Sequence, residues 1–308
     1  MEKLQTKAVL TPYPIDKAYD YALINAVDGQ AGAYVCVPLG QREVPAVIWG
    51  EGAGDIKPEK VKSILSQYNL PPLPEVHRKF LDWVASYTMA AKGAVLKLTL
   101  SVPKALEPPV TITGYTLGDK REDETGLSPA AKRILEVVQD NLPRRASELA
   151  EEAECSTGVI KTLHGKGFLK TVELQTPPPC RVPDAERAGA LLSAPQKECA
   201  DSLKNLVKAN KYGAALLDGV TGAGKTEVYF EAVAQALRQH KQVLILLPEI
   251  ALSNAFLSRF KSRFGCAPAL WHSSLSPAKR KVTWRGVAEG QSRVVVGARS
   301  ALFLPYQD

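Results

Sequence analysis

The stretch Gly219-Val220-Thr221-Gly222-Ala223-Gly224-Lys225-Thr226 follows the spacing G-x-x-x-x-G-K-T. In this pattern, successive backbone N–H groups turn inward around the phosphates of a nucleotide. The ammonium group of Lys225 reaches the β- and γ-phosphate oxygens, and the hydroxyl of Thr226 binds Mg²⁺. The stretch therefore predicts a site for a nucleoside triphosphate and Mg²⁺.

The sequence on either side of this loop supports the prediction. Ala214–Leu217 is an apolar run of strand length, and residues 225–240 place Tyr229, Val233 and Leu237 on one helical stripe. A helix that starts at the loop provides free N–H groups and the positive end of its dipole to bound phosphates. The alternative interpretation is a glycine-rich connector in an ordinary α/β unit.

Beyond the loop, the pattern alternates between strands and helices. We expect strands over 243–247, 267–271 and 293–296, and helices over 250–264 and 277–289. This order predicts a parallel sheet covered by helices, with ligands at the carboxyl ends of the strands. The loops there hold Pro248-Glu249, His272-Ser273-Ser274 and Gly297-Ala298-Arg299-Ser300.

The first hundred residues have a period of two, which is typical of strands. Strands are expected over 19–23, 35–39 and 44–49, in a small β-barrel or curled sheet. A helix is expected over 75–87. Its apolar residues Val76, Phe80, Trp83, Val84 and Tyr87 favour a core role, with a ligand-binding platform as the alternative.

The middle of the chain predicts a winged-helix domain between two linkers. Residues 107–126 are rich in Pro, Gly, Thr and charge, and 176–183 contain three consecutive prolines. Between them we expect helices over 129–139, 146–153 and 155–163 and a strand over 168–172. The third helix carries one basic side chain, Lys161, so we favour a packing or linking role over specific base reading.

Composition sets wider limits. The net charge of +7 favours a polyanionic partner, although weakly. The five cysteines form no C-x-x-C pair, so we expect reduced thiols and no zinc ligands. The first ten residues lack the apolar core of a signal peptide, and no apolar run reaches membrane-spanning length. We therefore expect a cytoplasmic protein that does not bind a membrane.

Several motifs together resemble one known family. They are GVTGAGKTEVY at 219–229, LLPEIAL at 246–252, HSSL at 272–275 and VVGARSALFL at 295–304. In order and spacing they are similar to the first helicase lobe of the PriA family, which restarts stalled replication forks. Tyr19-Asp20-Tyr21 and the segment 35–40 resemble that family's DNA 3′-end-binding domain.

The resemblance implies a multidomain α/β fold. Residues 1–105 would form a β-barrel-like domain that binds DNA 3′ ends, 106–127 a linker, 128–175 a winged helix, 176–190 a proline-rich linker, and 191–308 part of a RecA-like superfamily 2 helicase lobe. Within that lobe Lys225 and Thr226 would bind the phosphates and Mg²⁺ of ATP, and Gln196 would recognise adenine. The family also contains zinc, whose cysteine-rich insertion this chain does not hold.

The resemblance also assigns DNA contacts and partners. Residues implied to contact the DNA backbone are Pro248, Glu249, Gly297, Arg299 and Ser300. Residues implied to hold the terminal nucleotide are Tyr19, Asp20, Gly40 and Lys62. Residues 41–47 are less basic than is usual in the family and contain Pro45. The implied partners are forked DNA, single-stranded DNA, the single-stranded DNA-binding protein and other primosome proteins, with the chain itself a monomer.

Three functional hypotheses follow. The first is a part of an ATP-dependent helicase that moves 3′ to 5′ and promotes loading of the replicative helicase. The second is a fork-binding module that binds nucleotide without turnover, since the Asp-Glu-Glu-His motif and the second helicase lobe of the family are absent from the 308 residues. The third is a transcription regulator, which would require a basic recognition helix.

Overall fold

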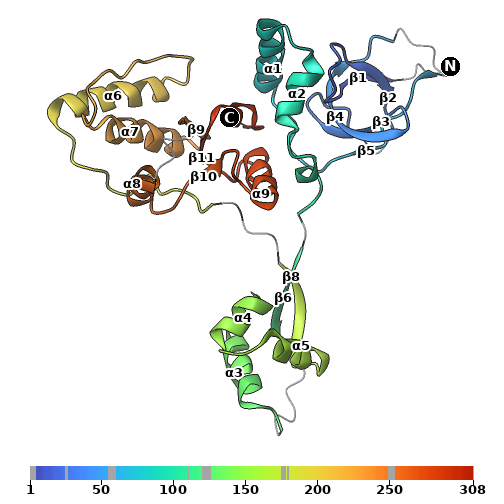
Figure 1. The fold of residues 1–308 in the computed structure, drawn as a ribbon, viewed down its shortest axis with the longest axis vertical. Helices are drawn as coiled ribbons and strands as arrows, with labels where there is room; N and C mark the ends of the chain where they lie inside the picture. The colour runs from blue at the N-terminus through green and yellow to red at the C-terminus, as the bar shows by residue number, and fades with distance from the viewer. Residues whose placement is uncertain are drawn as a thin grey trace. The chain divides into compact units, whose positions relative to one another are not determined.

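The computed structural model describes residues 5–24, 27–54, 60–109, 111–119, 126–174, 178, 180–248 and 254–307. The chain forms two compact units. One contains residues 1–107 and 178–308, and the other contains residues 108–177. Figure 1 shows the elements of both units.

The N-terminal module of the first unit is an antiparallel sheet of five strands, in the order β2-β1-β4-β3-β5. The strands are β1 (Thr6–Leu10), β2 (Tyr19–Ala22), β3 (Tyr34–Leu39), β4 (Arg42–Glu51) and β5 (Ser66–Gln67). The sheet curls around a buried cluster that includes Val35, Val37 and Ile48 (Figure 1). The backbone of Lys62 and Ile64 bonds to Ala22, so the segment before β5 also pairs with β2 at the opposite edge.

Two helices follow this sheet, α1 (Glu75–Thr88) and α2 (Lys92–Thr99). The face of α1 that is buried consists of His77, Leu81 and Ala85. The prediction of a core role is wrong for Val76, Trp83 and Tyr87, which are 80%, 58% and 75% exposed. Their stripe is centred about 140° around the helix from the buried one, and only one of the two can face the core. The rings of Trp83 and Tyr87 stack on each other at 5.1 Å instead.

The C-terminal lobe holds a parallel sheet of three strands in the order β10-β11-β9. Its elements are α6 (Ala194–Lys208), α7 (Lys225–Arg238), β9 (Val243–Leu246), α8 (Asn254–Phe264), β10 (Ala269–Trp271), α9 (Pro277–Ala288), β11 (Val294–Gly297) and the 3-10 helix η5 (Arg299–Phe303). Phe230 of α7 and Phe260 of α8 pack with Val294 and Val296, whereas Trp284 of α9 belongs to the cluster of Val295. The predicted parallel sheet with helices on both faces is thus present.

The strand expected over Ala214–Leu217 is not formed. This segment pairs with none of the described strands, and Leu216 is 93% exposed. An apolar run becomes a strand only when a neighbouring strand satisfies its backbone N–H and C=O groups. No described strand lies beside 214–217, so the glycine loop follows irregular backbone.

The N-terminal module and the C-terminal lobe share one hydrophobic core. Trp284 is fully buried, packs edge-on against Tyr34 at 5.9 Å, and donates from Nε1 to the carbonyl of Thr99 at 2.7 Å. The neighbouring guanidinium of Arg285 donates to the carbonyls of Asn69, Ala105 and Glu107. Helix α9 therefore joins the two modules through buried apolar packing and hydrogen bonds.

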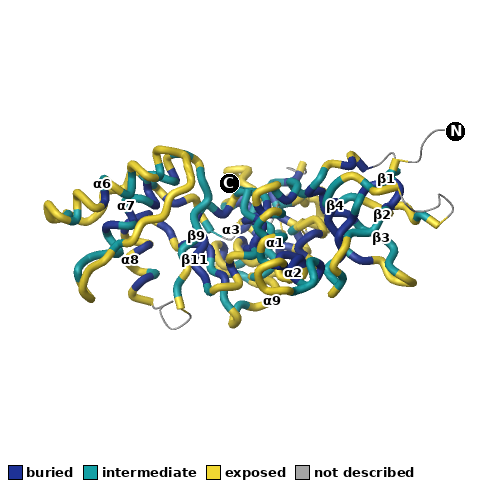
Figure 2. The backbone as a smooth tube through the Cα atoms, turned by 90° about the horizontal axis from the view of Figure 1, so that it is seen from above, coloured by how far each residue is buried: buried dark blue, intermediate teal, exposed yellow. Residues whose placement is uncertain are grey.

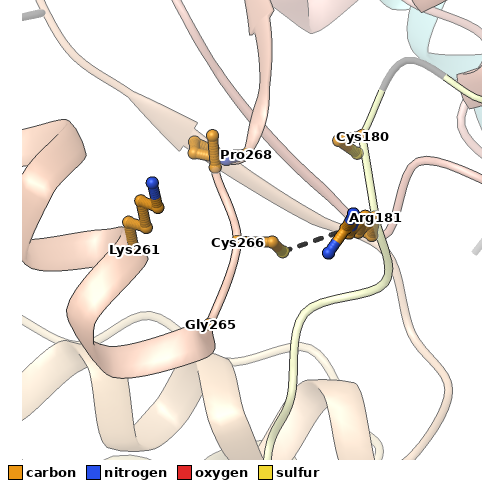
Figure 3. A pocket seen from close by; sticks show the side chains of 7 residues that line it. Cys180, Arg181, Lys261, Gly265, Cys266 and Pro268 are labelled. Carbon is orange, nitrogen blue, oxygen red and sulfur yellow. Dashed lines mark hydrogen bonds between the residues drawn. The ribbon is translucent and has the colours of Figure 1, made fainter. Parts of the chain in front are cut away.

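The segment expected to be a proline-rich linker lies along the lobe from residue 180 onward. The N–H of Asp184 donates to the carbonyl of Phe264 at 2.9 Å, and Arg238 pairs with Glu186 at 2.7 Å. The thiol of Cys266 donates to the carbonyl of Arg181 at 3.4 Å, beside a pocket of about 440 Å³ (Figure 3). Residues 180–187 therefore form an ordered segment, which we call the strap, because its backbone is hydrogen-bonded to α8 and α7.

Within its described residues, the second unit contains three α-helices and a three-stranded antiparallel sheet in the order β7-β6-β8. Its elements are β6 (Ile112–Leu117), α3 (Pro129–Val137), β7 (Arg144–Arg145), α4 (Ala146–Glu152), α5 (Thr157–Gly165) and β8 (Leu169–Leu174). Ile134, Leu149 and Ile160 form its core. The expected connector 106–127 contains β6, which supplies the central strand. Its alternation was obscured by Thr and Gly, and the partner β8 lies far along the chain.

Candidate functional site

The glycine loop leads directly into α7. Gly222 and Gly224 have φ angles of +83° and +76°, which side chains with a Cβ rarely adopt. The N–H groups of Lys225 and Thr226 in the first turn of α7 have no acceptor within the helix. The ammonium group of Lys225 donates to the carbonyl of Gly219 and, at 3.1 Å, to that of Val220. The loop is thus folded around its own lysine.

Gln196, which the resemblance assigns to adenine recognition, lies against this loop. Its Nε2 donates to the carbonyl of Ala223 at 3.0 Å, and its Oε1 accepts from the N–H of Ser193 at 2.8 Å, completing the capping box of α6. A Cβ on Gly224 would come within 2.6 Å of Nε2 of Gln196. Gln196 therefore supports both the loop and the start of α6, and both ends of its amide are engaged.

Tyr229 lies one turn beyond Thr226 on α7, and only a packing role was predicted for it from the helical stripe. Burial raises the pKa of Tyr229, and a hydrogen bond between its phenol and the hydroxyl of Thr226 opposes that rise. The Tyr229 phenol therefore orients the hydroxyl predicted to bind Mg²⁺. The spacing of three residues on a helix is the signal that could have revealed this pair.

These residues fit a magnesium nucleotide in part. The left-handed glycines leave room for phosphates beside the backbone, and α7 directs its unpaired N–H groups into that space. Among the described residues, no group of three or more His, Cys, Asp or Glu side chains is close enough to hold a metal ion. The hydroxyl of Thr226 would bind Mg²⁺ at this loop, with the phosphates of the nucleotide as further ligands.

A second set of predicted residues gathers at the carboxyl ends of β9 and β11. Pro248, Arg299 and Ser300 line one cavity of about 710 Å³ together with Leu246, Leu247 and Ala298. The N–H of Leu247 donates to the carbonyl of Gly297 at 3.0 Å. Arg299 and Ser300 are exposed, so a guanidinium and a hydroxyl are available to a phosphate chain.

Of the other two residues predicted to contact the DNA backbone, the structure describes Gly297 but not Glu249. Gly297 is buried, and a Cβ there would come within 2.5 Å of the carbonyl oxygen of Trp271. Its glycine is required for the close approach of β10 and β11, and its contact with the DNA backbone stays a prediction. Glu249 lies outside the described residues.

The residues predicted to hold a DNA end form two groups, Lys62 with Gly40 at the turn after β3, and the neighbours Tyr19 and Asp20 on β2. Lys62 donates from Nζ to the carbonyl of Gly40 at 3.2 Å, and Gly40 has a φ of +63° in the turn between β3 and β4. Tyr19 packs against the cluster that includes Leu39. Lys62 and Gly40 are therefore brought together at this turn, and Tyr19 faces the core of the same sheet.

Asp20 points to the other face, because side chains alternate along a strand. Its carboxylate accepts from the N–H groups of Ala53 at 3.2 Å and Gly54 at 2.8 Å. Asp20 is exposed enough to keep a free lone pair on each oxygen for a hydroxyl or a base N–H. The loop after β4 thus fixes the direction of the carboxylate, a contact that the sequence pattern did not indicate.

Comparisons with known proteins agree with this division. A family model described as a 3′DNA-binding domain matches residues 8–101, and a DEAD/DEAH box helicase model matches residues 193–307. The chain is 31% identical to the replication restart protein PriA of Haemophilus influenzae over 309 residues, covering 96% of this chain and 42% of the relative.

Two further relatives carry the same name. The protein of Rickettsia conorii is 29% identical over 299 residues, covering 96% of this chain and 35% of the relative. The protein of Bacillus subtilis is 35% identical over 165 residues, covering 53% of this chain and 20% of the relative. The chain thus spans less than half the length of these curated relatives.

Proposed function

Because this chain belongs to the PriA family of replication restart proteins, we propose that it binds stalled or branched replication forks through a DNA 3′-end site and a nucleotide-binding helicase lobe. The observation that carries the proposal is that the residues assigned to the two sites belong to one compact unit. The shared core around Trp284 holds the two modules in a fixed relation.

The 3′-end site consists of Tyr19, Asp20, Gly40 and Lys62. The Lys62 ammonium beside the Gly40 turn attracts the last phosphate, and Asp20 accepts from the free 3′-hydroxyl. Only a strand end offers that hydroxyl, so Asp20 distinguishes an end from continuous DNA. Pro248, Arg299 and Ser300 contact the backbone of the single strand at the carboxyl edge of the sheet.

The nucleotide site consists of the loop 219–226 and Gln196. When bound, Mg²⁺ neutralises charge that develops on the phosphates of ATP. Lys225 leaves the carbonyls of Gly219 and Val220 and turns to the phosphates, while the N–H groups of α7 hold them in place. Ala223 and Ser193 use one N–H and one lone pair of the Gln196 amide, so its second N–H and second lone pair would recognise adenine at the start of α6.

In the whole protein we propose ATP-dependent unwinding in the 3′ to 5′ direction and loading of the replicative helicase, in the cytoplasm. The stacked, exposed rings of Trp83 and Tyr87 form an apolar patch of the kind that binds partner proteins. No described helix is long and apolar enough to span a membrane.

The second unit has a different role from base reading. Residues 108–177 contain nine Lys or Arg and eleven Asp or Glu, so their net charge is −2 in a chain of net charge +7. A negative domain is repelled by the phosphate backbone. We assign this unit a linking or protein-docking role, which leaves no support for a transcription regulator.

Two measurements test the proposal. Anisotropy with a labelled fork should show tighter binding when the leading-strand end is a free 3′-hydroxyl than when it is 3′-phosphorylated. Steady-state ATP hydrolysis with and without fork DNA separates the helicase from the binding module. Stimulated turnover that Lys225→Ala removes supports the enzyme, and nucleotide binding without turnover supports the module. Equal affinity for both forks would contradict end recognition.

A further inference from the structure

Helix α6 carries three lysines on one face. Lys197, Lys204 and Lys208 are separated by seven and four residues, which places them within about 40° around a helix of 3.6 residues per turn. Lys197 and Lys208 are exposed, and the Lys204 side chain is 27% exposed. We refer to Lys197, Lys204 and Lys208 as the lysine stripe.

One acidic residue lies within the stripe. Asp201 pairs with Lys204 at 2.6 Å. The pKa of Asp201 is lowered, first by its hydrogen bond to Lys204 and further by the charges of Lys204, Lys197 and Lys208. All three ammonium groups thus lie close to one carboxylate, and the stripe keeps a net positive charge. Exposed Lys211 follows it directly.

Packing and helix stability leave the stripe unexplained. Ala200 is the buried residue of α6, and the helix packs on α7 through that side, while the rest of α6 is exposed or half-buried (Figure 2). The helix dipole favours Lys208 in the last turn. It disfavours Lys197, which follows a first turn that contains no acidic residue. A negatively charged ligand would be attracted by the three lysines on this face of α6.

We propose that the lysine stripe of α6 binds the phosphate backbone of double-stranded DNA, at a site separate from the 3′-end site. At 1.5 Å per residue, Lys197 and Lys208 lie about 16 Å apart along the helix. One strand of DNA presents about five phosphates over that length. Lysine acts as a point charge, so the contact is independent of base sequence. This inference rests on the DNA-binding function proposed above and adds a duplex contact to it.

The contact also has a route to the nucleotide site. Lys197 follows Gln196 in the chain, and Gln196 bonds the phosphate loop at Ala223. Duplex DNA on the stripe would therefore bind the same helix whose start is proposed to recognise adenine.

The test uses the full chain and a blunt duplex of about 25 base pairs with both 3′ ends phosphorylated, so that the 3′-end site is not engaged. The triple variant Lys197→Gln/Lys204→Gln/Lys208→Gln removes the stripe while keeping good helix formers. The control Lys97→Gln/Lys104→Gln/Lys132→Gln removes the same charge at exposed positions elsewhere. Anisotropy at several salt concentrations gives affinity and its salt dependence.

The stripe variant should lose about tenfold in affinity, and the slope of log affinity against log salt should become shallower by about 2 to 3. The control should change that slope by less than about 1. Asp201→Asn should tighten binding about twofold, because it removes a repelling charge. Equal losses in both triple variants, no loss in the stripe variant, or weaker binding by Asp201→Asn would each overturn the proposal.

Failure of the stripe and failure of end recognition are distinguishable. The fork assay compares two 3′ ends on one fork, whereas the duplex assay contains no free 3′-hydroxyl.

Discussion

The two sides of the helicase lobe are packed in opposite ways. Around α9, Trp284 and Trp271 are 0% and 2% exposed and are locked against the N-terminal module or the sheet. Around the phosphate loop, Tyr212, Leu216 and Val220 are 98%, 93% and 78% exposed. The lobe is thus tightly packed where the two modules meet, and its side chains are exposed around the proposed nucleotide site. Ligand-binding segments are commonly drawn from the less stable parts of a fold.

The largest expected effect comes from the packed side. Trp284→Ala removes a fully buried indole and leaves the carbonyl of Thr99 without its donor. The free energy of unfolding should fall by about 3–5 kcal/mol. Urea denaturation measures it, with Trp83→Ala as the matched control. Because Trp83 is 58% exposed, that variant should lose less than about 1 kcal/mol. Equal losses of unfolding free energy in the two variants would contradict a tightly packed contact at Trp284.

The next effect is a pH dependence in the same region. Burial lowers the pKa of His77 to about 4, and its Nε2 lies 3.3 Å from the hydroxyl of Thr99. The unfolded chain has a His pKa of about 6.5, so it binds the proton more tightly than the folded chain. The stabilisation is complete above about pH 6.5 and is lost as the pH falls toward 4, by about 3 kcal/mol.

His77→Gln should remove this contribution. Urea denaturation at a series of pH values should give a smaller loss of stability between about pH 6.5 and 4 for the variant than for the unmodified chain. Parallel curves for the two proteins would show that His77 is not buried in its neutral form.

On the open side, Gln196→Ala should have a smaller effect on stability and a larger one on ligand binding. It removes the capping box of α6 and the bond to Ala223, which should cost about 1 kcal/mol of unfolding free energy. The affinity for ATP should fall more than tenfold, measured with a fluorescent nucleotide. Gln196→Glu keeps the bond to Ser193 and loses the one to Ala223. If it binds ATP as the unmodified chain does, the contact with the loop is not required.

The elements predicted correctly are those whose sequence pattern depends on residues close together in the chain. Local patterns were sufficient for α7, α9 and the parallel strands, because their periodicity and caps lie within a few residues. The strand expected at 214–217 and the connector that became β6 depend on whether a distant strand is available for pairing. Helical spacing identified an apolar stripe on α1, yet only tertiary contacts decide which of two stripes is buried.

The candidate site shows the same division. The glycine loop, Gln196 and the group Pro248, Arg299 and Ser300 were identified from motifs, and the structure brings the members of each set together. Neither the bond of Asp20 to the loop at 53–54 nor the docking of the strap after residue 180 leaves a local signal. Both are made by segments far apart in the chain.

The most direct test of the central claim is the ratio of affinities for a fork with a free 3′-hydroxyl and for the same fork with a 3′-phosphate, measured for the unmodified chain and for Asp20→Ala. We predict that the unmodified chain clearly prefers the free 3′-hydroxyl. Asp20→Ala should abolish this preference, with little change in binding to the phosphorylated fork. An unchanged preference in Asp20→Ala would contradict the account, because the carboxylate held by Ala53 and Gly54 would then have no part in recognising the end.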